Sequence, residues 1–128
     1  MDEKYSLAWD ATRPVLHEVL GAGVWVQADD DAYLAELAEL LQRAPAGGFD
    51  VLSDARGYTM QTESDSDDQS YDMLAVAGCR RFVQVVTKTS VGLQTARMIR
   101  TSPQGSRLAF SVCASMEEAE AVLVGQAS

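Results

Sequence analysis

Short apolar runs and helical patterns alternate along the second half of this 128-residue chain, and this alternation restricts the fold more than any other feature. Residues 49–54, 81–87 and 108–113 each form an apolar run of strand length, and a helical pattern follows each run. Two parallel neighbouring strands need a crossover between them, usually a helix. The alternation therefore predicts parallel strands joined by right-handed crossovers.

The first half is expected to start with antiparallel strands. Residues 5–9 and 15–20 alternate between apolar and polar side chains, and residues 24–27 are expected to add a short third strand. The links between these segments are too short for crossover helices. The sequence thus predicts an α/β fold, with a mixed sheet of five or six strands, an antiparallel N-terminal part, and four helices packed on it.

The helix ends are predicted from capping patterns. The first helix should begin at the aspartates of residues 29–31, where the helix dipole favours negative charge. Ser64 or Ser66 is expected to start the second helix and Gly78 to end it, and segment 58–66 is a candidate loop. Hydroxyl side chains are expected to cap the remaining two helices: Thr89 or Ser90 for the third, and Ser115 with Glu118 for the fourth.

Length and composition indicate one domain over residues 1–128, with an apolar share of 47% that is ordinary for a globular protein. No apolar run is long enough to cross a membrane. The first residues are acidic and lack the apolar core of a signal peptide, so a cytoplasmic location is expected.

The charge of the chain is unevenly distributed. A net charge of −9 argues against nucleic-acid binding. Residues 80–107 contain six basic residues and no acid, whereas acids cluster in residues 29–31 and 63–72. Two interpretations stay open: solvated helix faces with acids at helix starts, or a polarised contact surface.

The chain contains few groups that could support catalysis or hold a metal. His17 is the only histidine, which excludes histidine-based zinc clusters and Ser-His-Asp machinery, and it is expected in a half-buried or surface strand. Cys79 and Cys113 are expected to be free, buried thiols. Asp50 and Asp54 lie too far apart along one strand to share a proton. We therefore expect no metal, no cofactor and no catalytic residues.

The order of motifs resembles the SpoIIAA-like group of the STAS superfamily, the domains related to sporulation anti-sigma-factor antagonists. The likeness covers nearly the whole chain and depends on the order of its motifs rather than on any one of them. It runs through Gly23, the leucines of the first helix, residues 49–57, 78–83 and 94–97, Phe110-Ser111, and residues 116–119.

The resemblance implies a bacterial, non-enzymatic domain used in protein–protein regulation or in sensing small ligands. In the phosphoswitch members a serine follows the acid at the end of the central strand. Here Ala55, Arg56 and Gly57 follow Asp54, and nothing places Thr59 in the acceptor's geometry, so that switch is not carried over.

The carboxyl ends of the predicted parallel strands define a candidate site. Arg56 and Lys88 beside a helix start could hold a phosphate or a carboxylate, although Asp54 could instead pair with Arg56. The residues of this hypothetical ligand site are Asp54, Arg56, Lys88, Thr89 and Ser90, with Ser115 nearby.

Two functions from different classes follow from these observations. The leading prediction is a non-catalytic regulatory domain that binds a protein partner or forms a homodimer. The alternative is a domain that binds a small anionic or lipidic ligand at the Arg56 and Lys88 edge, although a chain of this length leaves little room for a lipid-sized cavity.

Overall fold

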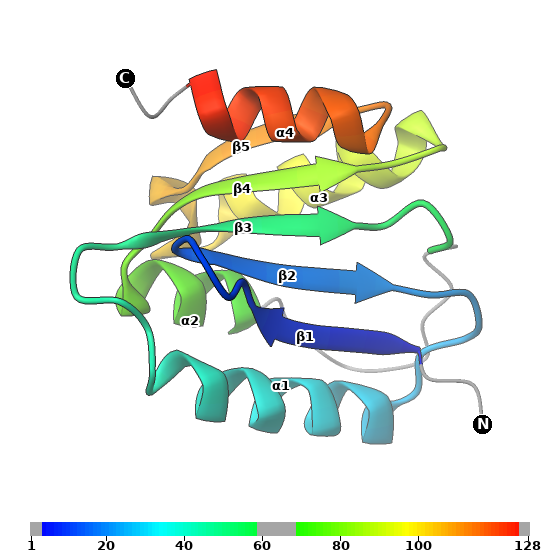
Figure 1. Ribbon diagram of the computed structural model, residues 1–128. Helices are drawn as coiled ribbons and strands as arrows, with labels where there is room; N and C mark the ends of the chain where they lie inside the picture. The colour runs from blue at the N-terminus through cyan, green and yellow to red at the C-terminus, as the bar shows by residue number, and fades with distance from the viewer. Residues whose placement is uncertain (1–3, 59–68, 126–128) are drawn as a thin grey trace.

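The computed structural model describes residues 4–58 and 69–125, which form one five-stranded sheet flanked by helices (Figure 1). The strands lie in the sheet in the order in which they occur in the chain. The strands are β1 (Tyr5–Trp9), β2 (Val15–Leu20), β3 (Phe49–Asp54), β4 (Cys79–Val85) and β5 (Ala109–Cys113), and the helices are α1 (Gln27–Leu41), α2 (Gln69–Ala77), α3 (Thr89–Thr101), the 3-10 turn η1 (Gly105–Arg107) and α4 (Met116–Gly125).

The sheet is mixed, as the sequence predicts. β1 pairs with β2 in antiparallel register, and every later neighbouring pair is parallel. The helices α1, α2 and α3 connect β2 to β3, β3 to β4, and β4 to β5. The predicted α/β class, the antiparallel start and the four helices are confirmed. As a consequence, the carboxyl ends of β2 to β5 meet at one edge of the sheet.

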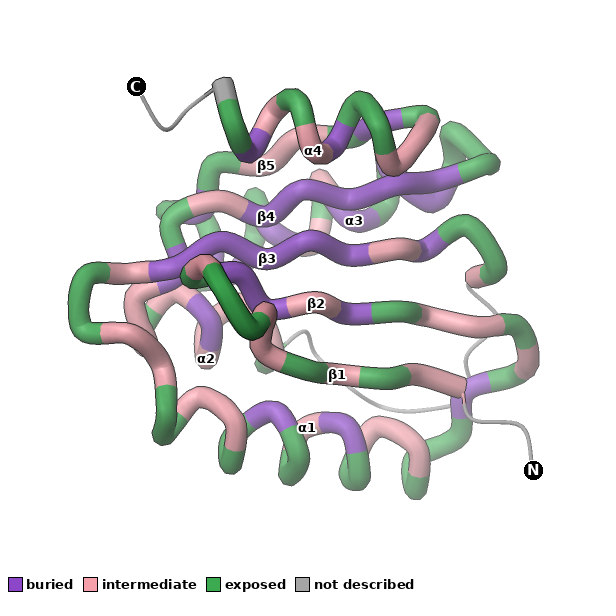
Figure 2. Tube along the Cα trace, in the orientation of Figure 1, coloured by how far each residue is buried: buried purple, intermediate pink, exposed green. Residues whose placement is uncertain are grey.

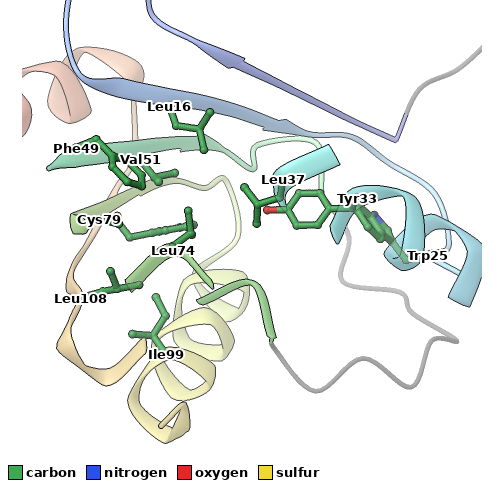
Figure 3. Packing of buried hydrophobic residues seen from close by; sticks show 11 residues of the cluster. Leu16, Trp25, Tyr33, Leu37, Phe49, Val51, Leu74, Cys79, Ile99 and Leu108 are labelled. Atoms are coloured by element: carbon green, nitrogen blue, oxygen red, sulfur yellow. The ribbon is translucent and has the colours of Figure 1, made fainter. Parts of the chain in front are cut away.

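The two faces of the sheet are covered unequally. The helices α1, α2 and α3 lie on one face, where Leu37, Leu74 and Ile99 pack against strand residues such as Phe49 (Figure 3). The helix α4 covers part of the other face by itself, where Leu123 packs in a smaller core. The central strands β3 and β4 are buried along most of their length, as their continuous apolar runs predict (Figure 2).

The expected strand at residues 24–27 is wrong. Trp25 makes only an isolated bridge, and α1 already begins at Gln27. The indole of Trp25 packs edge-on against Tyr33 at a centroid distance of 5.8 Å, and the Tyr5 ring lies at the same distance. The apolar residues of this segment therefore serve core packing after a turn at Gly23, whose φ is +116°.

Two further boundaries differ from the expectation. The strand β4 spans Cys79–Val85 rather than 81–87, because Gly78 adopts a φ of +109° and the chain re-enters the sheet directly after it. Gly78 thus ends α2 as predicted. The predicted starts of α2 at Ser64 or Ser66, and all of the candidate loop except Tyr58, lie outside the described residues.

The start of α1 confirms the role predicted for the acids. The Asp29 carboxylate accepts a hydrogen bond from the Val26 backbone N–H at 2.9 Å and forms an ion pair with Lys4 at 2.7 Å. These bonds lower the pKa of Asp29, with the Lys4 contact as the largest cause. The carboxylate therefore fixes the helix start to the residue that precedes β1.

Candidate functional site

The structure brings the predicted site residues to one edge of the sheet. Asp54, the last residue of β3, pairs in register with Val85, the last residue of β4. The Thr87 hydroxyl donates a hydrogen bond to the Arg56 carbonyl at 2.9 Å and so connects the two loops that follow these strands. The predicted residues that share this edge are Asp54, Arg56, Lys88, Thr89 and Ser90.

At this edge the acid and the guanidinium bind each other. Arg56 Nε and Nη2 donate to the two carboxylate oxygens of Asp54, each at 2.8 Å, and the Arg56 backbone N–H donates to Oδ1 at 3.2 Å. The Arg56 side chain lowers the pKa of Asp54, and Asp54 in turn raises the pKa of Arg56. An anion at this edge would therefore have to share a guanidinium that already carries a bidentate carboxylate.

The predicted hydroxyl cap of α3 is wrong. Lys88 occupies the cap position in an extended conformation, no side chain caps the helix, and Thr89 is already the first helical residue. Thr89 and Ser90 therefore lie inside the helix and not at its cap position. The Lys88 ammonium has no lone pair with which to accept a hydrogen bond from a backbone N–H group. At α4 the predicted cap is confirmed, because Ser115 Oγ accepts the Glu118 N–H at 3.1 Å.

Two of the six basic residues of segment 80–107, Arg80 and Arg81, lie at the opposite end of the sheet, near the start of β4. Arg80 and Arg81 line a cleft of about 420 Å3 together with Arg13 and the buried Asp50. Arg81 Nη1 donates to the Val122 carbonyl at 3.1 Å, and Arg81 Nη2 lies 3.7 Å from the Asp50 carboxylate. Arg81 thereby ties the end of α4 to the sheet, which is a structural role.

A buried carboxyl cluster was missed by the sequence analysis. Glu18 of β2 is only 5% exposed, and its carboxylate accepts hydrogen bonds from the Tyr33 hydroxyl and from Ser53 Oγ, the latter at 2.5 Å. The register places Glu18 directly beside Ser53 of β3. Burial raises the pKa of Glu18, and the same burial together with Glu18 raises the pKa of Tyr33 well above its ordinary value.

A signal for this cluster exists in the sequence. In an alternating strand, every second side chain points to the same face. Glu18 therefore shares a face with Leu16 and Leu20, both apolar, rather than with His17 and Val19. An acid on the apolar face of a strand indicates a buried and hydrogen-bonded carboxyl group.

A small cavity of about 100 Å3 lies beside the cluster, between α1, α2 and the end of β2. Two polar atoms of its lining residues, Trp25 Nε1 and Asp30 Oδ2, are buried without a hydrogen-bond partner among the residues that the structure describes. The described lining residues are Glu18, Leu20, Trp25, Asp30, Tyr33, Leu34, Tyr58, Ser70, Tyr71, Phe82 and Met98.

Comparison with known proteins supports the fold. A solved structure from Shewanella loihica PV-4, described as an uncharacterised protein of the DUF3478 family with a SpoIIAA-like fold, superposes with a TM-score of 0.65. The match covers 96% of this chain and 98% of the other, at 12% sequence identity. No protein-family model and no curated protein matches the sequence.

This chain has a SpoIIAA-like fold. The match spans almost the full length of both proteins, so the likeness concerns the whole arrangement of strands and helices and not one motif. Within residues 4–58 and 69–125, no helix combines the length and the apolar character that crossing a membrane requires.

Proposed function

We propose that this chain is a non-catalytic regulatory domain that acts through protein–protein contact, first of all with a second copy of itself. The observation that carries the proposal is the outer edge of β5. Among the described residues β5 is the last strand in the sheet order and pairs only with β4, so its other side keeps unpaired backbone groups. An antiparallel pairing of two β5 strands from two copies is two-fold symmetric and closes after a dimer.

The side chains at this edge support the pairing. β5 reads Ala-Phe-Ser-Val-Cys and contains neither the lysine nor the proline that usually blocks an edge strand. Val112 on β5 is 46% exposed, and Leu93 on the neighbouring helix α3 is 68% exposed. A partner strand would cover apolar surface that is otherwise in water.

The charges at the two ends of β5 are complementary. Arg107, just before the strand, is exposed and basic, whereas Glu117, in the first turn of α4 after the strand, is exposed and acidic. Antiparallel pairing brings the start of one strand next to the end of the other. Arg107 of each copy would then lie near Glu117 of the other, at the rim of the interface.

The side-chain chemistry supports a non-catalytic role. Ser53 donates its hydroxyl to Glu18, but it is fully buried, so a substrate has no access to it. His17 is engaged with Asp10 at 2.8 Å. Ala55 takes the place after Asp54 where phosphoswitch proteins carry their serine, so regulation would have to act through binding rather than through that modification.

The test is the oligomeric state of charge variants, measured by light scattering on a size-exclusion column. We expect a dimer that weakens with salt, a monomer for Arg107→Glu, and recovery of the dimer in Arg107→Glu/Glu117→Arg, because the reversed pair restores the attraction. Arg43→Glu, an exposed site after α1, is the matched control and should leave the dimer intact. A monomeric parent protein at every ionic strength would overturn the proposal.

A second candidate is the anion site at the Arg56 and Lys88 edge. Lys88 favours it, because its exposed ammonium has no hydrogen-bond or ion-pair partner among the described residues and stands at the start of α3. Inorganic phosphate should then raise the melting temperature of the parent protein but not that of Arg56→Ala or Lys88→Ala. Equal shifts in all three proteins would mean that phosphate binds elsewhere.

A further inference from the structure

The cavity beside Glu18 has the chemistry of a cation site. Its described lining holds two carboxyl groups, Glu18 and Asp30, and no lysine, arginine or histidine. Aromatic rings make up much of the remaining wall, and their faces attract positive charge. The aromatic lining residues are Trp25, Tyr33, Tyr58, Tyr71 and Phe82. Among the described lining residues a ligand with negative charge would meet two acids and no compensating base, so this part of the wall selects against anions.

Unsatisfied polar atoms in the lining indicate that the cavity holds a partner. Asp30 Oδ2 offers an acceptor and Trp25 Nε1 offers a donor, and neither has a hydrogen bond within the described part of the chain. Trp25 itself is only 6% exposed, so its N–H cannot rely on bulk water. A buried polar group without a partner destabilises the fold, and a hydrogen bond from a ligand or an ordered water would recover that loss.

The size of the cavity limits the ligand. A dry engineered cavity of roughly 150 Å3 holds benzene. The cavity here measures about 100 Å3. It therefore accepts a headgroup of about four heavy atoms, or about three water molecules.

We propose that this cavity binds a small organic cation, a protonated primary amine that carries a neighbouring hydroxyl or carbonyl oxygen. The ammonium donates hydrogen bonds to Asp30 Oδ2 and to the carboxylate of Glu18, which Tyr33 and Ser53 already hold in place. The neighbouring oxygen accepts the N–H of Trp25. Each group of the ligand thus meets a group of the cavity that is otherwise without a partner or without a counter-charge.

Proton release should accompany this binding. Within the part of the chain that the structure describes, the groups that face Glu18 are Tyr33 and Asp30 of α1, Ser53 of β3, Tyr58 after β3, and Tyr71 of α2. No base is among them, and burial raises the pKa of Glu18, so the empty cavity retains the Glu18 proton to a higher pH than an exposed glutamate would. A cation favours the ionised form, so affinity should rise as the pH rises through that raised pKa.

The test is isothermal titration with four probes of similar size: ethanolamine, propylamine, ethylene glycol and acetate. We expect ethanolamine to bind most tightly, propylamine more weakly, and the neutral and anionic probes not at all. Repeating the ethanolamine titration in buffers of different ionisation enthalpy should show a proton released on binding. Tighter binding of acetate or ethylene glycol would overturn the assignment to a cation.

Variants separate the charge from the oxygen contact. Glu18→Gln should weaken ethanolamine binding about tenfold or more, since a charge-assisted hydrogen bond is lost. Glu36→Gln removes the same negative charge at an exposed position. It is the matched control and should bind ethanolamine as the parent protein does. Trp25→Phe keeps an aromatic ring in the wall and removes the indole N–H, so it should weaken ethanolamine binding more than propylamine binding.

Thermal unfolding monitored by circular dichroism verifies that each variant folds. Should Glu18→Gln fail to fold, Asp30→Asn removes the other charge and should weaken both amines. Failure of every probe to bind the parent protein would show that the cavity holds only water and would overturn the proposal. None of these results bears on the β5 dimer, whose residues lie elsewhere.

Discussion

Two neighbouring residues of β2 show that charged groups are solvated differently on the two faces of this sheet. His17 points toward the face that α4 covers alone, where Nε2 lies 2.8 Å from Asp10. Asp10 also pairs with Arg13, and Arg13 forms a bidentate pair with Glu120 of α4 at 2.8 Å. Glu18, the next residue, points toward the face covered by α1, α2 and α3 and is buried with two hydroxyl donors.

The pKa directions on the two faces are opposite for a physical reason. His17 is the largest cause that lowers the pKa of Asp10, and Arg13 lowers the pKa of Glu120. On the other face burial outweighs two hydrogen bonds and raises the pKa of Glu18. On the face that α4 covers alone, basic neighbours and solvent favour the ionised form of the acids. On the face that α1, α2 and α3 cover, desolvation opposes ionisation.

The largest expected effect comes from truncating a buried side chain on the face of the sheet that α1, α2 and α3 cover. Leu37 of α1 is completely buried in the larger core, so Leu37→Ala should cost about 2–5 kcal/mol of the free energy of unfolding. Urea unfolding measures the loss. Val76→Ala on α2, where the residue is 73% exposed, is the control and should change stability by less than about 0.5 kcal/mol. Equal losses would contradict the assigned core.

A second prediction tests the buried acid through the pH dependence of stability. The folded pKa of Glu18 is above its unfolded value of 4.5, so the folded protein holds more protons between these values and loses stability as the pH rises through them. Glu18→Gln should remove this loss, which amounts to at most about 1.4 kcal/mol for each pH unit between the two pKa values. A parent-minus-variant stability difference that grows with pH would show that Glu18 is ionised in the fold.

The smallest effect on stability is expected on the face of the sheet that α4 covers alone. Glu120→Gln breaks the charge pair with Arg13, but both side chains are a third or more exposed, so the cost should not exceed about 1 kcal/mol. Because the folded pKa of Glu120 is lowered, this stability is present above its unfolded value and is lost as the pH falls through the folded pKa. Glu36→Gln, at an exposed glutamate of α1, is the control, and high salt should reduce the difference between the two variants. A loss as large as that of Leu37→Ala would make the comparison of the faces wrong.

Much of the fold could be predicted because it depends on local pattern. The apolar runs of β3 and β4, the leucines of α1 and the glycine at the end of α2 each identify an element from neighbouring residues alone. The segment around Trp25 could not be assigned in this way. Its residues have strand propensity, but tertiary contact of the indole with Tyr5 and Tyr33 holds it in another conformation.

The candidate site divides in the same manner. The strand ends correctly placed Asp54, Arg56 and Lys88 at one edge, because parallel strands share their carboxyl ends. The bidentate use of Arg56 by Asp54, which the sequence left as one of two possibilities, is a matter of side-chain distance. The alternation of β2 places Glu18 on an apolar face, but its hydrogen bond from Tyr33 comes from a different element and depends on the tertiary structure.

What the amino-acid order alone determined is the succession of strands and helices, since hydrophobic period and turn residues act over a few positions. What only the tertiary structure decided is which charges lose contact with water. His17 and Glu18 are consecutive, yet His17 stays partly exposed beside Asp10 and Glu18 lies in a closed core. That difference arises from the unequal covering of the two faces by helices distant in the chain, and solvation depends on this three-dimensional covering.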